Sequence, residues 1–465
     1  MTQRLAEHTR DREWGDRVAF LIDDDTWTFT QVFDGAARAA NGYRSAGLHP
    51  GDRVLLALPD SIELVWCLLG AWQAGLVAIP VNVQMSQEDL TRDVTTAEPA
   101  LAVVDPATAG WLHDAGLAPT IEAEPLIGKG PDTQFADGGQ RPALGLSPPA
   151  PPEPQTVLLP PQQLRAPTRP GRFIRPRNRL PVDVANVFPG RFEHLAVHHA
   201  RNRTDHGPLA PQGDPAAAVA LMRRHEVTNL FAQPSFLARL LLEPDHAETL
   251  SRLRLVTCAG EALSARLREQ LTPLLGTRLI NAYGATEIGG IAIGRPAMYD
   301  TPSAVGPPFD NRPVRIVDPD GHPLPTGQRG ELHIRVPFAT CGVTRGSLGP
   351  RQLTDTWWPT GDLASLDENS VIHVHGRLDD IEVIGGQNVV PGEIERLLES
   401  HPRVLEAAVS AVRRPAGHTT LRAYLVSTPP PNQTRRQART TWPPNSSTSP
   451  DPDCPGTKSP TTSYG

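Results

Sequence analysis

Strand-like and helix-like segments alternate in two separate stretches of this sequence, and that alternation constrains the fold most. Within residues 17–105, a helix is predicted to start near Asp60, where Glu63 stands three positions on as in a capping box, and to end at Gly75. Short apolar runs predict strands before and after it: Val54–Leu58, Val77–Val81 and Leu101–Val104. This βαβαβ order favours a mostly parallel sheet covered by helices.

The same alternation returns after Asp214. The helices predicted there run from Asp214 to about Arg224, from Ser235 and from Ser264. The apolar runs between them predict three more strands: Asn229–Ala232, Arg254–Cys258 and Thr277–Ile280. In open α/β sheets, ligands bind beyond the carboxyl ends of the strands. We therefore expect a binding site where the last of these strands ends.

The rest of the sequence predicts smaller units. β-Hairpins are indicated after Val305, and a short α+β unit begins after Arg377. The predicted fold class is α/β, with a large N-terminal domain of mostly parallel, helix-covered sheets plus a small β subdomain, then a small, truncated α+β C-terminal domain. The predicted ranges are 1–376 for the large domain, 377–428 for the small domain and 429–465 for a disordered tail.

Two proline-rich segments interrupt this pattern. Residues 142–215 hold 16 of the 50 prolines and residues 429–465 hold nine, so these segments contain half of them. Without periodic apolar positions, residues 160–213 and the tail are predicted to be irregular or disordered. Only two of the 44 basic residues are lysines, which is typical of a GC-rich gene. A frameshift in such a gene would produce these segments, and resequencing that finds one continuous frame would contradict it.

Composition argues against several classes of protein. The net charge of -7 does not favour nucleic acid or an anionic membrane as main partner. The four cysteines lie far apart with no CxxC spacing, so neither a disulfide framework nor a zinc site is indicated, and the cytoplasm is the expected location. Gln73, Gly75 and Pro80 interrupt the apolar run Leu64–Val83, which therefore predicts a core helix and strand and no membrane span.

Residues 281–287 follow the strand predicted at 277–280 and combine groups that suit a nucleotide. Tyr283 offers an aromatic face for stacking, and Gly284 lets the backbone approach a ligand closely. The Thr286 hydroxyl can hydrogen-bond a phosphate, and the Glu287 carboxylate can hold a hard cation such as Mg²⁺. A turn after a buried strand often has a similar composition, so this motif alone leaves both readings open.

Three further blocks follow the Tyr283–Glu287 motif in order: Thr360–Leu363, Gly376–Asp380 and Ile384–Glu395. The ordered series resembles the adenylate-forming superfamily of acyl-CoA synthetases, adenylation domains and luciferases. The resemblance covers roughly residues 17–159 and 214–428. It includes two segments similar to family segments beside the acyl pocket: Val227–Leu241 and Cys258–Leu263.

The resemblance implies a role for each matching residue around the nucleotide. Tyr283 would stack on adenine with Gly284 beside it, Thr286 would touch the α-phosphate, and Glu287 would help hold Mg²⁺. Asp362 would accept hydrogen bonds from the ribose hydroxyls. The same set would also contain these nucleotide-binding residues: Arg377, Gly260 and Glu261. The alternative for Asp362 is a turn carboxylate, and for Arg377 a surface cation.

The resemblance also implies residues for a second step. Asp379 matches the hinge on which the small domain turns between adenylation and thioester formation. The entrance for pantetheine would be shaped by Gly385, Gly386 and Pro391. The pattern of residues 385–391 is more similar to stand-alone CoA ligases than to amino-acid adenylation domains.

Two departures from the family pattern bear on activity. The Ser/Thr/Gly-rich phosphate loop should follow Leu159, but the sequence there is Pro160–Pro167. Proline has no N–H to offer a phosphate, so this stretch lacks the usual backbone donors. The catalytic lysine of the family also has no clear counterpart, because Lys458 lies in the proline-rich tail without the expected flanking residues.

The predicted activity is ATP- and Mg²⁺-dependent conversion of a carboxylic acid to an acyl-adenylate, followed by thioester formation with coenzyme A or a carrier-protein pantetheine. Because the phosphate loop and the lysine are lost, we expect this activity to be impaired. The alternatives are a non-catalytic relic that at most binds nucleotide, and an amino-acid adenylation domain. The sequence does not identify the acid.

Two other clusters are weaker candidates. One is a possible metal site made of Glu193, His194, His198, His199 and His206, in which His194 and His198 stand one helical turn apart. The arginine-rich run 165–179 could bind phosphate or nucleic acid, but it lacks aromatic residues and periodicity. A solvated, irregular segment is the simpler interpretation of both.

Overall fold

The computed structural model describes residues 15–427 with gaps. The residues that it leaves out within this range are 17, 23–24, 84–85, 107–118, 129, 132–143, 147–155, 160–193, 199–207, 210–213, 286–287, 310–311, 336–341, 345–356, 385–386, 402 and 415–418. The segments predicted to be irregular, 160–213 and 429–465, thus lie almost wholly outside the described residues. The domain boundaries remain predictions.

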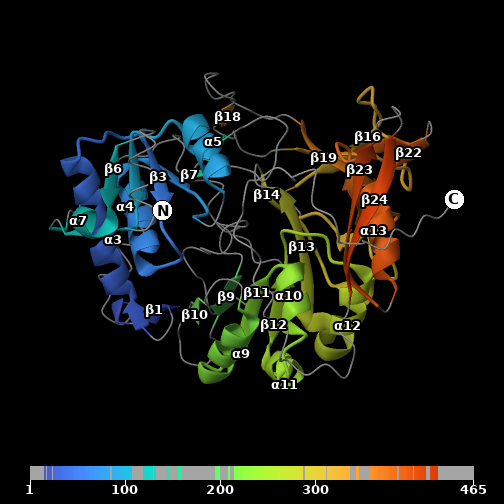
Figure 1. Ribbon diagram of the computed structural model, residues 1–465, viewed down its shortest axis with the longest axis horizontal. Helices are drawn as coiled ribbons and strands as arrows, with labels where there is room; N and C mark the ends of the chain where they lie inside the picture. Colours follow the sequence, from blue (N-terminus) through green and yellow to red (C-terminus); the bar gives the residue numbers. More distant parts are fainter. Residues whose placement is uncertain are drawn as a thin grey trace, which may run out of the picture. The chain divides into compact units, whose positions relative to one another are not determined.

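A seven-stranded sheet has the strand order β18-β8-β7-β4-β3-β5-β6. Figure 1 labels four of its strands: β18, β7, β3 and β6. The strands from β7 to β6 run parallel, whereas β8 pairs antiparallel with β7 and β18. The strands are β3 (Arg53–Ala57), β4 (Val77–Pro80), β5 (Leu101–Val104), β6 (Thr120–Glu122), β7 (Leu144–Leu146), β8 (Thr156–Leu159) and β18 (Gly342–Thr344).

Helices cover both faces of this sheet because its central strands are apolar on both sides. Val54 and Leu56 of β3 belong to the cluster formed with three helices, α3 (Phe29–Ser45), α4 (Ile62–Ala74) and α7 (Ala123–Ile127). Leu55 and Ala57 point to the other face and pack with α5 (Gln87–Ala97). Alternation along a strand places neighbouring residues on opposite faces. The predicted helix-covered parallel sheet is confirmed.

The start of α4 differs from the prediction. Ser61, not Asp60, is the N-cap, and its hydroxyl accepts a hydrogen bond from the backbone N–H of Leu64 at 3.4 Å. The third helical position is therefore Leu64, and no capping box forms with Glu63. At the other end, Gly75 has φ +76° as the C-cap, which is the left-handed conformation that glycine adopts without strain. The predicted helix end is confirmed.

A second, five-stranded sheet has the order β14-β13-β12-β11-β9. Its central strands β11, β12 and β13 are parallel, and β9 and β14 pair antiparallel at the two edges. The strands are β9 (His194–His198), β11 (Asn229–Ala232), β12 (Leu255–Cys258), β13 (Leu279–Ala285) and β14 (Gly289–Gly294). The helices packed on it are α9 (Pro215–Arg224), α10 (Pro234–Leu240), α11 (His246–Arg252) and α12 (Ala265–Leu275).

The strand expected at 277–280 starts later and runs further. Gly276–Arg278 form a 3-10 turn, and β13 extends from Leu279 to Ala285. Tyr283 therefore lies within a strand, paired with Ala292 of β14, and not in a turn after one. The antiparallel partner explains the difference, because β14 starts at Gly289 and pairs with the residues of β13 beyond Ile280.

An antiparallel sheet in the order β15-β20-β19-β17-β16 follows in the chain. Its strands are β15 (Ala304–Gly306), β16 (Val314–Val317), β17 (Gly330–Arg335), β19 (Trp357–Leu366) and β20 (Ile372–Arg377). Its apolar residues, including Ile334 and Ile372, form a core with Ile288 and Ile291. β16 pairs with β17 and β19 with β20, both antiparallel, so the predicted hairpins are confirmed.

The remaining described elements are small. A short α+β unit after β20 contains β21 (Glu382–Ile384), β22 (Gln387–Val389), α13 (Pro391–Glu399), β23 (Val404–Arg413) and β24 (Thr419–Ser427). A three-stranded sheet contains β1 (Val18–Ile22), β2 (Asp25–Thr28) and β10 (Pro208–Leu209). The 3-10 turn η2 spans Pro296–Met298. None of the described helices is long and apolar enough to cross a bilayer.

The histidine pair proposed as a metal candidate does not lie on a helix. His194 and His198 are the end residues of strand β9. Residues four apart on a strand are separated by about 13 Å, because each residue advances the chain by about 3.3 Å. The helical spacing that suggested two ligands of one metal is therefore absent.

His375 on β20 makes the stability of the fold depend on pH. Its Nε2 lies 3.0 Å from the Ser365 hydroxyl, and burial, aided by the charge of Arg329, lowers its pKa from 6.5 to about 4. The other charged or titratable groups that face it are Glu393, His373 and Arg396. The unfolded chain binds a proton at His375 below about pH 6.5, whereas the folded chain does so only near pH 4. The free energy of unfolding is therefore unaffected by His375 above about pH 6.5, and it decreases as the pH falls from 6.5 to 4, because only the unfolded chain binds the proton in this range.

We predict that His375→Gln weakens this pH dependence. The difference in free energy of unfolding between pH 7 and pH 5, measured by urea denaturation, becomes smaller in the variant than in the wild type. His322→Gln is the matched control, because this histidine is exposed on a turn. An equal loss of stability on acidification in the wild type and in His375→Gln would contradict the assignment.

Candidate functional site

The polar cluster around Tyr283 joins residues from two sheets. β13 carries Tyr283, and the Tyr283 hydroxyl donates a hydrogen bond to Oδ2 of Asp362 on β19. Arg377 of the neighbouring strand β20 donates from Nη1 to Asp362 Oδ1 at 3.4 Å. Asp362 is paired directly with Arg377 across the two strands. Three residues from separate sequence motifs therefore meet at one carboxylate.

The backbone around Asp362 is fixed by Thr360. The backbone N–H of Asp362 donates to the Thr360 hydroxyl at 3.1 Å, and that hydroxyl donates to the Leu332 carbonyl at 2.9 Å. The Thr360 carbonyl in turn accepts from Arg377 Nη1 at 2.9 Å. Gly361, which lies between Thr360 and Asp362 in the chain, has φ +73°. The sequence motif contained Thr360, but no role was predicted for it, because only the fold brings Leu332 and Arg377 to it.

Arg377 links the predicted ribose ligand to the predicted hinge. Its Nε donates to Asp379 Oδ1 at 3.0 Å and its Nη2 donates to Asp379 Oδ2 at 3.4 Å. Burial lowers the pKa of Arg377, but the hydrogen bond to Asp379 and the charges of Asp362 and Asp379 outweigh it, so the net shift is upward. The guanidinium therefore stays charged and holds both carboxylates.

Burial sets the electrostatics at the centre of the cluster. Asp362 is 8% exposed, and this burial raises the pKa of its carboxyl group despite the opposing hydrogen bond from Tyr283 and the charge of Arg377. Burial, then the charge of Asp362, raise the pKa of Tyr283 well above 10. The phenol is therefore a hydrogen-bond donor at neutral pH and Asp362 is the acceptor.

Gly284 is required by the pairing of β13 with β14. A side chain at this position would place its Cβ 2.6 Å from the Gly289 carbonyl oxygen, closer than any real Cβ contact. The close backbone approach at Gly284 is therefore one between two strands, and its predicted approach to a ligand stays a prediction. Thr286 and Glu287, the predicted phosphate and Mg²⁺ residues, lie outside the described residues.

Gly260 and Glu261 follow β12, which is parallel to β13 and pairs Cys258 with Asn281. Because β12 and β13 are parallel, the residues that follow their carboxyl ends lie on the same side of the sheet. The Glu261 carboxylate has a partner in the protein: it accepts from the backbone N–H and from the hydroxyl of Ser235, each at 2.9 Å. These two hydrogen bonds, here called the Ser235–Glu261 clamp, join the two segments that resemble the acyl-pocket region, and no local pattern in the sequence predicts them.

The start of α10 was predicted one residue late. Gln233 is the N-cap and Pro234 the first helical residue, so Ser235 lies inside the first turn. Proline suits this position because it has no N–H to lose and its φ is already helical. N–H groups in the first turn have no partner within the helix. The Ser235 N–H can therefore donate to the Glu261 carboxylate.

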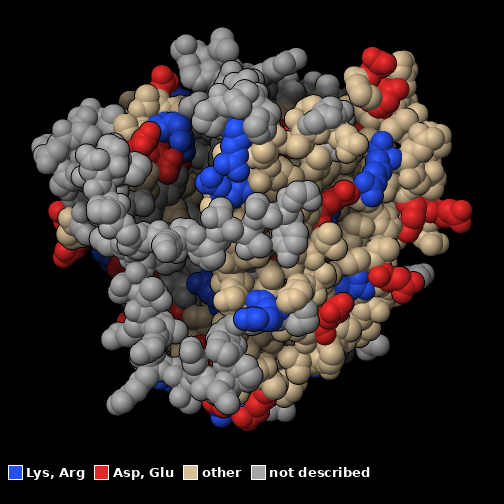
Figure 2. Space-filling model, turned by 45° about the vertical axis from the view of Figure 1, so that its right-hand side comes forward, with Lys and Arg blue, Asp and Glu red and all other residues tan. Residues whose placement is uncertain are grey.

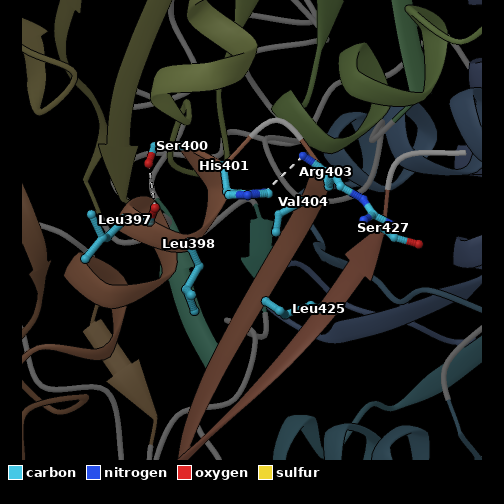
Figure 3. Close-up of a pocket in the computed structure, with 8 residues that line it drawn as sticks. All are labelled: Leu397, Leu398, Ser400, His401, Arg403, Val404, Leu425 and Ser427. Atoms are coloured by element: carbon cyan, nitrogen blue, oxygen red, sulfur yellow. Dashed lines mark hydrogen bonds between the residues drawn. The ribbon is translucent and has the colours of Figure 1, made fainter. Parts of the chain in front are cut away.

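Residues predicted to shape the pantetheine entrance are only partly described. Pro391 is buried at the first position of α13, whereas Gly385 and Gly386 lie outside the described residues. An open pocket of about 760 Å³ lies beside α13 and the β23–β24 ribbon, and apolar and polar residues line it in equal number (Figure 3). Its lining residues include Leu397, Leu398, Val404 and Leu425. It is lined by residues 397–427 alone and contains no member of the Tyr283 cluster.

One group of potential metal ligands occurs among the described residues. Asp318, Asp320 and His322 bring ligand atoms within 4.8 Å of one another on an exposed turn. Asp318 Oδ1 already accepts from the backbone N–H groups of Asp320 and His322, at 3.0 and 2.8 Å. This arrangement is a side-chain-capped turn. On the face in Figure 2, the described basic and acidic side chains lie in small interspersed groups.

Comparison with known proteins agrees with these observations. The family model described as AMP-binding enzyme matches residues 7–159 and 206–348. The p-hydroxybenzoic acid–AMP ligase FadD22 of Mycobacterium tuberculosis is 32% identical over 449 residues, covering 91% of this chain and 61% of that protein. The chain thus spans about three fifths of this relative's length. A feruloyl-CoA synthase of Amycolatopsis is 27% identical, covering 83% of this chain and 81% of that enzyme.

Solved structures share the fold. The anthranilate CoA ligase AuaEII, in complex with anthranoyl-AMP, superposes with a TM-score of 0.75 at 20% identity, covering 94% of this chain and 88% of that one. ATP-bound MatB from Rhodopseudomonas palustris gives 0.72 at 23% identity, covering 92% and 88%. At these identities, the likeness concerns architecture. It confirms the α/β fold class with a large N-terminal and a smaller C-terminal part.

Proposed function

This chain belongs to the AMP-binding enzyme family, and from that premise we propose that it uses ATP to activate a carboxylic acid as an acyl-adenylate. The observation that carries the proposal is the cluster at Asp362, where the aromatic motif of β13 meets the carboxylate and arginine of β19 and β20. An aromatic ring, a carboxylate and an arginine are the groups that bind a base, vicinal hydroxyls and a phosphate.

In the proposed first step, a carboxylate oxygen of the substrate attacks the α-phosphorus of ATP. The bond from that phosphorus to the bridging oxygen breaks, and pyrophosphate leaves. Tyr283 and Asp362 bind and orient the adenosine part, and Arg377 supplies a fixed positive charge beside it. Orientation of this kind contributes to the rate by holding the reacting groups in place.

In the proposed second step, the sulfur of a thiol attacks the acyl carbonyl and AMP leaves, while the thiol proton is released. The acceptor is coenzyme A, with a carrier-protein pantetheine as the alternative. Names among the relatives point to CoA as the acceptor and to aromatic acids as substrates, including feruloyl-CoA synthase and p-hydroxybenzoic acid–AMP ligase. We propose an aromatic carboxylic acid and a cytoplasmic location.

Mg²⁺ belongs to the proposal as a substrate-bound ion. When bound, it offsets negative charge on the phosphates. Its predicted ligand is Glu287, which lies outside the described residues. We also propose that the rate is low, because Pro160, Pro161 and Pro167 replace backbone donors of the phosphate loop.

Product analysis tests the proposal. The protein is incubated with ATP, Mg²⁺ and one aromatic acid at a time, with and without coenzyme A, and AMP and acyl-CoA are measured by mass spectrometry. We expect AMP and an acyl-CoA that both depend on the acid. Acid-dependent AMP without a thioester would favour adenylation alone. ATP binding without any AMP would favour the non-catalytic relic.

A further inference from the structure

The Tyr283 hydroxyl does something that a stacking role does not require. It donates to Asp362 Oδ2, while Arg377 occupies Oδ1 at 3.4 Å. A carboxylate has about four lone-pair sites, two on each oxygen. One site on each oxygen is therefore taken by the protein and one on each remains. Two remaining acceptors on adjacent oxygens match two vicinal hydroxyl donors.

The rest of the surroundings fix Asp362 in one orientation. Its backbone N–H is bound to the Thr360 hydroxyl at 3.1 Å, and the residue is 8% exposed. The hydrogen bonds from Tyr283 to Oδ2 and from Arg377 to Oδ1 restrain rotation of the Asp362 carboxylate. The Tyr283 ring is itself packed against the apolar core of the third sheet, so its hydroxyl is held at a fixed position. Tyr283 thus presents a rigid donor to a buried acceptor.

We infer that the Tyr283 hydroxyl is a specificity-determining group that orients Asp362 to distinguish ribose from deoxyribose in the bound nucleotide. The inference rests on the proposed function, because it takes the ligand to be an adenosine nucleotide. It goes beyond a flat ring that stacks on adenine. Phenylalanine at this position keeps the aromatic face and lacks the hydroxyl donor. Tyr283→Phe therefore separates the stacking role of the ring from the hydrogen-bonding role of the hydroxyl group.

The direct test compares ATP with 2′-deoxy-ATP. Dissociation constants are measured by calorimetry for the full-length wild type and Tyr283→Phe. We expect the wild type to prefer ATP about tenfold, the size of one hydrogen bond to a charged group. In Tyr283→Phe, Asp362 is no longer held, and the preference falls to about twofold. Tyr299→Phe is the matched control, because no hydrogen bond joins Tyr299 to Asp362, and it keeps the tenfold preference.

A double-mutant cycle separates specificity from folding. If Tyr283 acts through Asp362, adding Tyr283→Phe to Asp362→Asn leaves the small remaining preference for ATP unchanged. Thermal denaturation of each variant checks that the protein is folded. A loss of affinity by the same factor for both nucleotides, with the preference kept, overturns the inference and leaves the proposed function standing. Failure of the wild type to bind either nucleotide overturns both.

The pH profile of ATP binding gives a second readout. The charged and titratable groups that face the Asp362 carboxyl group are Tyr283 and Arg377, whereas the neutral Thr360 hydroxyl accepts from the Asp362 backbone N–H. Burial raises the pKa of Asp362, and the Tyr283 hydrogen bond opposes that rise most. Tyr283→Phe therefore moves the acid-side loss of ATP affinity to higher pH. An unchanged midpoint would contradict the inference, because a purely structural role leaves the carboxyl pKa alone.

Discussion

Asp362→Ala is expected to weaken ATP binding about 100-fold. The substitution removes the acceptor proposed for the ribose hydroxyls, and it leaves the Tyr283 hydroxyl and the Arg377 Nη1 group without their shared partner. Hydrogen bonds to charged groups contribute about 1.5–3 kcal/mol each, and a 100-fold change in affinity corresponds to about 2.7 kcal/mol. Calorimetric titration with ATP measures the effect.

Two other variants serve as comparisons for Asp362→Ala. Asp320→Ala removes a carboxylate from an exposed turn and should leave the affinity unchanged. Asp362→Asn keeps the shape but accepts through one oxygen only, so its affinity should lie between those of the wild type and Asp362→Ala. Wild-type affinity in a folded Asp362→Ala protein would exclude Asp362 from the nucleotide site.

Phe236→Ala is expected to lower the free energy of unfolding by about 3–5 kcal/mol, the range for emptying the site of a buried phenylalanine. Phe236 is 1% exposed and packs in the core between the second sheet and its helices. It lies next to Ser235, whose two hydrogen bonds hold Glu261. Urea denaturation measures the loss of stability.

The control for Phe236 keeps most of the buried surface. Phe236→Leu should cost less than half as much, because less of the site is emptied. Met298→Ala, at a residue that is 67% exposed, should change stability by less than about 0.5 kcal/mol. A Phe236→Ala protein as stable as the wild type would show that this cluster is not a structural core.

Local patterns predicted the elements of the sheets well. Val54–Leu58 is apolar at every position, and a strand buried on both faces requires that composition. Gly75 marked a helix end because few other residues adopt its backbone conformation without strain. These features depend on neighbours in the sequence, so the sequence alone expresses them.

Features that depend on distant partners were missed or shifted. The length of β13 depends on its pairing with β14, and the local apolar run ended at Ile280. The Ser235–Glu261 clamp joins residues 26 positions apart, and the Tyr283–Asp362 hydrogen bond joins residues 79 apart. The resemblance to a family selected Tyr283, Asp362 and Arg377 one by one. Only the fold showed that they share one carboxylate.

The exchange of radioactive pyrophosphate into ATP tests the central claim most directly, because it reports reversible formation of an acyl-adenylate without a thiol acceptor. We predict exchange that requires an aromatic acid and is lost in Asp362→Ala but retained in Asp320→Ala. The rate should be low, in line with the proline-containing phosphate loop. Exchange no faster with any acid than without one, in a wild-type protein shown to bind ATP, would contradict the proposed activity.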